Sequence, residues 1–286
     1  MENIPSTRSM IITLYGDYIR HYGNEIWIGS LIELLAAFGY NEQSVRAAIS
    51  RMSKQNWLES RKEGNKSFYS LTKFGKRRTE EAAGRIYQVE PGKWDGKWRI
   101  FFYKIPEERR KVRDQLRNEL IWSGFAPLSN SAWISPNDLK EQVYTIVKKY
   151  DIADNVNFFV SENIGTKSNT QIVSEYWDIE EINRTYEKFI SLFKDGYQND
   201  ESKIRSGKLS NQKCFVRRAL LVHEYRKSLF VDPGLPKELL PNKWKKEEAV
   251  HLFQKYYRIL EQPANEYFEE VFSKGYGKIT KNSNIM

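Results

Sequence analysis

Residues 44–78 read SVRAAISRMSKQNWLESRKEGNKSFYSLTKFGKRR, and the features that decide the N-terminal fold lie in this stretch. Val45, Ile49 and Met52 recur at the spacing that places side chains on one face of a helix. The runs WLESR and KSFYSLT flank a Gly-Asn turn at 63–66, which is typical of a β-hairpin. The stretch therefore predicts a short amphipathic helix followed by a hairpin.

Two further helices are expected before this stretch. Apolar residues recur at helical spacing within 6–22 and again within 31–38, and Asn41 can then cap the short helix. After the hairpin, Thr72 is expected to cap a basic helix. Three helices followed by a hairpin are the order of a winged helix-turn-helix domain, which we predict over residues 1–88.

The positive charge of the chain is concentrated in the same stretch. The whole chain has a net charge of +9, and residues 44–78 alone hold ten basic and two acidic side chains. A field focused in this way suits a polyanion such as nucleic acid. A solvated basic face and a winged helix used for protein contact are the alternative interpretations.

The outward face of the short helix carries side chains suited to a DNA groove. Arg reaches guanine edges, Gln and Ser hydrogen-bond to bases or phosphates, and Ala permits close approach. The tip of the hairpin adds cations that would lie over the adjoining backbone or minor groove. The residues predicted to contact DNA are Gln43, Ser44, Arg46, Ala47, Ser50, Arg51, Lys54, Arg61, Lys62 and Lys66.

A second region follows a linker that is predicted at 88–97 from its Pro and Gly residues. Strands are predicted at 98–104, 132–135 and 156–160, with an amphipathic helix in each interval between them. This order is typical of a small ferredoxin-like α+β domain, which we predict over 97–175.

From Trp177 onward the pattern is helical, which predicts a C-terminal helical domain over 176–286. The tail after Gly275 is polar and is expected to fray. The candidate helices are 179–194, 211–230, 247–261 and 264–274. We therefore expect an α+β multidomain chain with a winged helix-turn-helix, a ferredoxin-like central domain and a helical C-terminal domain.

Composition excludes several classes of protein. The chain is 40% hydrophobic with eight Trp, which excludes global disorder, and no apolar run approaches the ~18 residues of a membrane span. The first residues lack the pattern of a signal peptide. The single cysteine, Cys214, fits a reducing cytosol, and three scattered histidines do not predict a metal cluster. We expect a cytoplasmic protein with no membrane contact, no metal and no cofactor.

Four stretches resemble the PaaX family, which are repressors of bacterial phenylacetic acid degradation operons. They are STRSMIITLYGDYI at 6–19, the stretch at 44–78, WRIFFYKIPEERRKVRDQLRNELIWSGFAPLSNSAWISP at 98–136, and HEYRKSLFVDPGLPKELLPNKW at 223–244. The last is the most specific, since DPGLP…ELLP…W has no general structural reason to recur. The resemblance covers nearly the whole chain in the expected order.

The PaaX resemblance implies a homodimer that binds palindromic double-stranded operators through the third helix and the wing. It also implies release of the operator when an aryl-CoA thioester binds, typically phenylacetyl-CoA. Aromatic rings beside cations could stack on adenine or the acyl ring and pair with phosphate, although core packing is the alternative for each. The candidate effector-binding residues are His223, Tyr225, Arg226 and Trp244.

The central stretch also resembles the small ferredoxin-like nuclease subunit of CRISPR spacer acquisition. That family ends its first strand in Tyr-Asp-Ile-Pro with a metal-binding Asp, whereas this chain has Lys104 at the position of the acid. An ammonium group cannot ligate Mg²⁺, and the chain carries no phosphate-loop or nucleophile motif. We expect a scaffold or dimerisation module and no enzymatic activity; a metal-dependent nuclease or acyl-CoA hydrolase built on the last two domains is the alternative.

Overall fold

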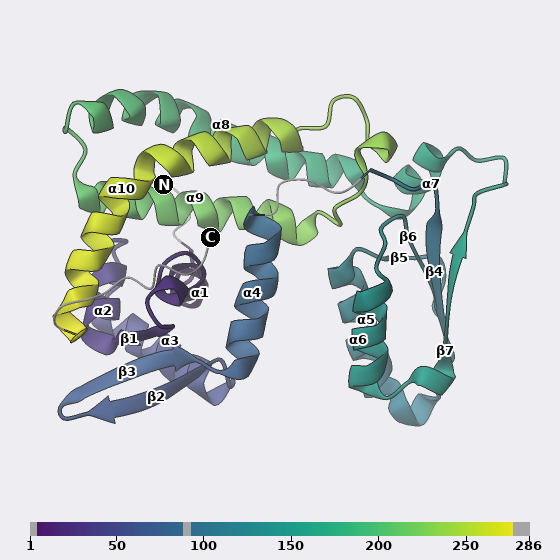
Figure 1. Cartoon of the computed structure of the whole chain (residues 1–286), viewed down its shortest axis with the longest axis horizontal. Helices are drawn as coiled ribbons and strands as arrows, with labels where there is room; N and C mark the ends of the chain where they lie inside the picture. The colour runs from purple at the N-terminus through teal and green to yellow at the C-terminus, as the bar shows by residue number, and fades with distance from the viewer. Residues whose placement is uncertain (1–4, 88–92, 277–286) are drawn as a thin grey trace. The chain divides into compact units, whose positions relative to one another are not determined.

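The computed structural model describes residues 5–87 and 93–276, and the chain forms two compact units (Figure 1). The first unit comprises Met1–Gln88, Lys188–Lys227 and Glu248–Met286, and the second comprises Val89–Glu187 and Ser228–Glu247. The residues predicted as a separate helical domain, 176–286, therefore contribute to both units. Half of the predicted linker (88–92 of 88–97) and most of the predicted frayed tail (277–286) lie outside the described residues.

The N-terminal part of the first unit has the predicted order of helices, followed by a hairpin and a further helix. Its elements are α1 (Thr7–Asp17), β1 (Glu25–Trp27), α2 (Ile28–Ala36), α3 (Glu42–Lys54), β2 (Leu58–Glu63), β3 (Lys66–Leu71) and α4 (Lys73–Tyr87). The three strands form an antiparallel sheet in the order β1-β3-β2. The short strand β1 thus adds a third strand to the predicted hairpin.

The core of this region forms where α1 packs against α3. Ile11 and Leu14 of α1 and Val45 and Met52 of α3 are completely buried. Burying a side chain of this size contributes roughly 1.5–3 kcal/mol, so the apolar faces hold the helices together. The inward stripe that the sequence predicted for 44–54 is confirmed, and it leaves the opposite face of α3 toward solvent.

Three long helices complete the first unit, and each of them also contributes residues to the second unit. They are α8 (Ile179–Arg205), α9 (Asn211–Val231) and α10 (Lys246–Tyr276). The prediction of separate helices at 247–261 and 264–274 is wrong, because α10 continues through Pro263. Leu260, Ala264 and Phe268 are buried on either side of the proline, and this packing offsets the missing backbone hydrogen bond.

The C-terminal end of α10 packs against the sheet and α2 of the first unit (Figure 1). The Ser30 hydroxyl donates a hydrogen bond to the backbone oxygen of Val271 at 2.8 Å. Gly275 lies so close to Trp27 that a Cβ on the glycine would approach the tryptophan Cβ to 2.7 Å. This contact joins residues almost 250 positions apart in the chain, and it requires glycine at position 275.

The second unit contains an antiparallel sheet in the order β5-β6-β4-β7. Its elements are β4 (Trp98–Tyr103), α5 (Arg110–Ser123), β5 (Ala126–Pro127), β6 (Ala132–Ser135), α6 (Lys140–Tyr150), β7 (Val156–Ser161) and α7 (Asn169–Tyr176). The predicted strands and intervening helices are confirmed. The sequence did not predict β5, which has two residues, or α7, which a capping box between Ser168 and Gln171 begins.

Both faces of this sheet are covered in part by apolar side chains. Helices α5 and α6 cover one face (Figure 1), and there their residues pack with Phe101 and Trp133. Trp98 and Ile134 pack on the other face with Val173 of α7 and with a segment that includes Leu235. The β4 strand is therefore central to the unit, and its C-terminal end positions Lys104.

Candidate nucleic-acid interface

The N-terminus of α3 is fixed by the residue that the sequence predicted. Asn41 is the N-cap, and its side-chain oxygen accepts a hydrogen bond from the Ser44 backbone N–H at 2.8 Å. The Ser44 hydroxyl donates back to the Asn41 carbonyl at 2.8 Å. Ser44, a predicted DNA contact, is therefore half-buried and already engaged in the cap.

The outward face of α3 gathers most of the other predicted contacts. Val45, Ala48 and Ile49 are buried beneath it. The predicted contacts that are exposed on this face are Gln43, Arg46, Ala47, Ser50, Arg51 and Lys54. The structure thus brings six of the ten predicted residues together on one solvent-facing side of a helix, which is the geometry that entry into a groove requires.

Arg46 is held by a neighbour on the same helix. Its guanidinium lies 2.7 Å from the carboxylate of Glu42, one turn earlier. The two side chains are 57% and 59% exposed, and a helical pair of this kind contributes only about 0.3–0.5 kcal/mol. A phosphate or guanine could replace Glu42 at little cost. The i, i+4 spacing in the sequence was the signal for this pair.

Arg61 is held more firmly, by acids from two strands. Its guanidinium donates to Glu25 of β1 at 3.0 and 2.6 Å and to Glu63 of β2 at 2.5 Å, and it lies over the Phe68 ring. The hydrogen bonds from Arg61 hold the pKa of the Glu25 carboxyl below its usual range. Sequence spacing gave no signal for Glu25, which is 36 positions away.

Lys66 binds the end of a helix from the other end of the chain. Its ammonium donates to the backbone oxygens of Lys274 at 3.2 Å and Gly275 at 3.1 Å, and it lies 5.0 Å from the centre of the Trp27 ring. A cation is favourable at this position because the C-terminus of a helix carries partial negative charge. Lys66 therefore attaches the hairpin to α10.

The predicted cations thus divide into two groups. Arg46, Arg61 and Lys66 have partners within the chain. Arg51, Lys54 and Lys62 are exposed, and over the described ranges 5–87 and 93–276 no acid lies within ion-pair distance of them. The second group is available to a ligand without the sacrifice of an internal ion pair.

Two of the four candidate effector residues join α9 to α1 inside the first unit. Arg226 donates to the Ser9 hydroxyl at 2.6 Å and to the Ser9 carbonyl at 3.2 Å. The His223 Nδ1 atom lies 3.3 Å from the Thr13 hydroxyl. Both side chains are buried, and burial together with Arg226 lowers the pKa of His223 to about 3. His223 is therefore neutral at physiological pH.

The other two candidates have aromatic partners of their own. Tyr225 is buried in the first unit and stacks on Phe253 of α10, with ring centres 4.2 Å apart. Trp244 belongs to the second unit, where its ring meets the edge of Tyr186 at 5.7 Å. Within the first unit the structure brings His223 and Arg226 together against α1, whereas Tyr225 packs against α10. Effector contact at these positions stays a prediction.

The DPGLP run has a packing role within the second unit. The Asp232 carboxylate accepts hydrogen bonds from the Gly234 backbone at 2.7 Å and from the Tyr186 hydroxyl at 2.5 Å. The carbonyl of Pro233 accepts from the Asn137 side chain at 3.1 Å. These bonds fix the turn after α9 against the start of α6, which supplies a structural reason for this distinctive motif.

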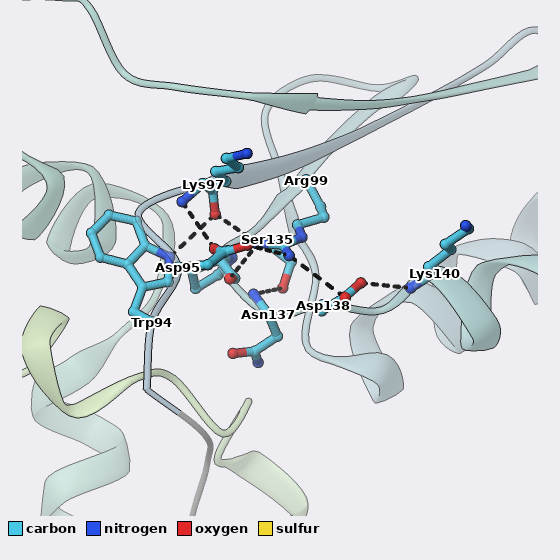
Figure 2. A network of polar contacts seen from close by, with 9 residues as sticks. Trp94, Asp95, Lys97, Arg99, Ser135, Asn137, Asp138 and Lys140 are labelled. Carbon is cyan, nitrogen blue, oxygen red and sulfur yellow. Dashed lines mark hydrogen bonds and ion pairs between the residues drawn. The ribbon is translucent and has the colours of Figure 1, made fainter.

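A buried arginine fixes the entry to the central strand (Figure 2). The Arg99 guanidinium donates to both carboxylate oxygens of Asp95, at 2.8 and 2.7 Å, and to the backbone oxygen of Lys97 at 3.0 Å. Asp138 lies 3.8 Å away on the opposite side. This network ties the segment before β4 to the loop before α6, and it belongs to the framework rather than to a site.

Three features of the described residues bear on alternative functions. Lys104 is exposed just after the end of β4, at the position where the resembling nuclease carries its acid. No cluster of three or more His, Cys, Asp or Glu that could hold a metal ion occurs in 5–87 and 93–276. No helix in these ranges is long and apolar enough to cross a membrane.

Family models match three consecutive parts of the chain. Residues 6–75 match "PaaX-like protein", residues 91–173 match "PaaX protein central Cas2-like domain", and residues 177–270 match "PaaX-like protein C-terminal domain". The chain is 36% identical over 250 residues to the transcriptional repressor PaaX of Escherichia coli K12. That alignment covers 86% of this chain and 78% of the relative.

A solved structure shares the fold. The uncharacterised protein Rv0674 from Mycobacterium tuberculosis superimposes with a TM-score of 0.58, covering 93% of this chain and 98% of that one. The two sequences are 18% identical, so this likeness concerns the fold alone.

Proposed function

Since this chain belongs to the PaaX family of transcriptional regulators, we propose that it is a sequence-specific DNA-binding repressor that inserts α3 into the major groove of an operator. The observation that carries the proposal is the division of α3 into a buried apolar face and an exposed face of Gln, Arg, Ser and Lys. Three helices followed by the β2–β3 hairpin support a winged helix-turn-helix assignment for this region.

The hairpin supplies contacts to the DNA backbone in this proposal. Lys62 is exposed at the tip and has no internal partner among the described residues, so it reaches phosphate directly. Arg61 and Lys66 mainly fix the hairpin, because Glu25 and the end of α10 hold them. Arg51 and Lys54 then extend the basic surface along the last turn of α3.

The second unit serves as the dimerisation module of this repressor. The β-α-β-β-α-β order with the sheet order β5-β6-β4-β7 supports a ferredoxin-like assignment. A homodimer presents two copies of α3, which suits a palindromic operator. Lys104 at the end of β4 favours this role over metal-dependent nuclease chemistry, since its ammonium group cannot ligate a divalent cation.

We further propose that the regulated genes serve phenylacetate catabolism and that an aryl-acetyl-CoA such as phenylacetyl-CoA releases the repressor. The route of release would run through α9. His223 and Arg226 contact Thr13 and Ser9 of α1, and α1 packs against α3. A ligand that favours a different position of α9 would therefore change the support of α3. If the thioester binds the DNA-free form more tightly than the operator complex, operator affinity must fall by the same factor.

Fluorescence anisotropy with a labelled operator fragment tests DNA binding. The double variant Arg46→Ala/Arg51→Ala is expected to weaken operator binding. Each arginine that forms two hydrogen bonds to a base contributes roughly 1–3 kcal/mol, and the variant loses that contribution. Arg205→Ala/Lys208→Ala is the matched control, because it removes the same charge from exposed positions of the same unit that lie outside α3. Unchanged operator affinity in the double variant would contradict the assignment of α3.

Titration of the operator complex at fixed salt tests release. Phenylacetyl-CoA is expected to lower operator affinity roughly 5–150-fold, the range of typical allosteric coupling, whereas phenylacetate and CoA added separately are not. No response to any acyl-CoA, with DNA binding intact, would remove the effector from the proposal. Cleavage of the operator or hydrolysis of the thioester during the titration would instead support the enzyme alternative.

A further inference from the structure

A hollow of about 510 Å³ lies in the second unit, between the end of β4, the first turns of α5 and the loop before β6. Its charged and polar lining includes Lys104, Arg110, Arg113, Asp114, Arg117 and Ser131. The four cations face a single carboxylate, that of Asp114. None of these residues takes part in the DNA-binding surface proposed above, and they belong to a different unit.

The arginines converge because of their spacing on α5. Positions 110, 113 and 117 are three and four residues apart, so they share one face of the helix. Lys104 approaches the same space from the end of β4. Like charges at this spacing on a helix repel one another, and Asp114 and Glu107 offset only part of the four positive charges, so a bound anion would relieve the repulsion.

Three of the four cations form no ion pair with an acid of the described residues. Arg113 forms an ion pair with Glu107 at 2.9 Å. Lys104, Arg110 and Arg117 are exposed, and in the part of the chain that the structure describes none has an ion-pair partner within 4.0 Å. The adjacent Arg109 shows the contrast, since its guanidinium is occupied by the backbone oxygens of Tyr150 and Asp151.

We propose that this hollow binds the linked phosphate groups of a small diphosphate-bearing molecule, such as a nucleoside diphosphate. Guanidinium groups bind phosphate oxygens in a bidentate manner, and a lysine adds a point charge. The volume lies within the roughly 300–1,000 Å³ of small-molecule sites. The inference does not depend on α3 binding DNA.

Isothermal titration calorimetry of the full chain with inorganic pyrophosphate, ADP and adenosine tests the site. Pyrophosphate and ADP are expected to bind saturably at about 150 mM salt, whereas adenosine is not. The triple variant Lys104→Gln/Arg110→Gln/Arg117→Gln is expected to lower the affinity at least tenfold. The matched control is Lys111→Gln/Lys140→Gln/Lys148→Gln, which removes the same charge from α5 and α6 at exposed positions outside the hollow.

The outcomes separate the sources of phosphate. Tighter binding of ADP than of pyrophosphate identifies a nucleotide, and equal binding identifies the diphosphate group alone; both support the site. Absence of saturable binding, or equal affinity in the triple and control variants, overturns it. The proposal is also overturned if the wild-type protein fails to bind pyrophosphate and the triple variant binds duplex DNA more weakly than wild type. The cations would then contact DNA. Operator affinity measured on the same variants distinguishes this failure from failure of the proposed repressor.

Discussion

The first unit uses arginine in two opposite ways. On α9 the Arg218 guanidinium is 4% exposed and pairs with the fully buried carboxylate of Asp17 at 3.2 Å. It also donates to the Asn265 side chain at 2.7 Å and to the Tyr257 hydroxyl at 2.5 Å. On α3 the Arg46 side chain is 57% exposed and pairs with one equally exposed glutamate.

This contrast teaches that burial, rather than charge, decides how much a basic residue contributes to the stability of the fold. Removing one partner of a buried ion pair leaves an uncompensated charge in a medium of low dielectric, which costs several kcal/mol. An exposed pair contributes a few tenths of a kcal/mol, so its cation is available for a ligand. We therefore expect changes on α9 to affect folding and changes on α3 and the hairpin to affect DNA binding.

The largest effect is expected from Arg218→Met. This change removes the Arg218 cation from the buried Asp17 carboxylate, and it should lower the free energy of unfolding by about 3–5 kcal/mol. Urea denaturation followed by circular dichroism measures the change. The control Arg205→Met, at a side chain 79% exposed, should stay within about 0.5 kcal/mol of wild type. Equal effects of the two variants would contradict the role given to burial.

The second effect is a dependence of stability on pH through His223. The ring takes up a proton near pH 6.5 in the unfolded chain, whereas in the folded chain its pKa is about 3. The unfolded state therefore binds more protons between these values, and stability falls as the pH drops through this window. Between pH 7.5 and 4.5 wild type should lose roughly 2–3 kcal/mol more than His223→Gln.

Denaturation curves of wild type, His223→Gln and His251→Gln at both pH values provide the measurement. His251 is exposed on α10 of the same unit, so the His251→Gln variant should follow wild type. Parallel pH curves for wild type and His223→Gln would show that the ring is not held neutral by its surroundings.

A smaller effect separates the two hairpin lysines. Lys62→Gln should reduce the slope of log affinity against log salt by about 0.9, because the variant neutralises one phosphate fewer. Lys66→Gln should leave that slope nearly unchanged and lower the free energy of unfolding by about 0.3–1 kcal/mol, because it removes the cation at the C-terminus of α10. Anisotropy titrations at several salt concentrations, with denaturation of each variant, measure both quantities. The reverse assignment of the two effects would refute the division of the cations.

The smallest effect concerns Glu25 and Arg61. Arg61 lowers the pKa of the Glu25 carboxyl in the folded chain. The pair therefore stabilises the folded chain at pH values above the ordinary glutamate pKa, and this contribution is lost as the pH falls through the lowered pKa. Wild type should therefore lose more stability than Glu25→Gln between pH 7 and about pH 3.5. Thermal denaturation at both pH values measures the difference. Glu59→Gln, at an exposed position on β2, should show the pH dependence of wild type.

Local features of the sequence predicted the elements that depend on local interactions. The N-cap at Asn41, the buried stripe of α3 and the turn before Lys66 each follow from a few neighbouring residues, and the structure confirms all three. The outward face of α3 followed from the same periodicity, which is why its exposed residues could be identified from the sequence.

Interactions between distant residues were beyond such patterns. The sequence predicted a break between 261 and 264, where Pro263 lies, but the buried residues Leu260 and Phe268 on either side keep α10 continuous. Glu25 and Gly275 hold two of the predicted DNA-binding cations from 36 and 209 positions away. A count of positive charges identified the basic surface, but only the fold distinguishes its occupied cations from its available ones.

The attachment of Lys66 to the end of α10 has a consequence for protein engineering. The end of α10 completes the region that contains the hairpin. It accepts hydrogen bonds from Lys66 and Ser30, and Gly275 leaves space for the Trp27 side chain. The N-terminal 88 residues are therefore not an interchangeable cassette. A chimaera that transplants this specificity onto a relative must carry 248–276 with it, so two segments that are far apart in the sequence must be exchanged together.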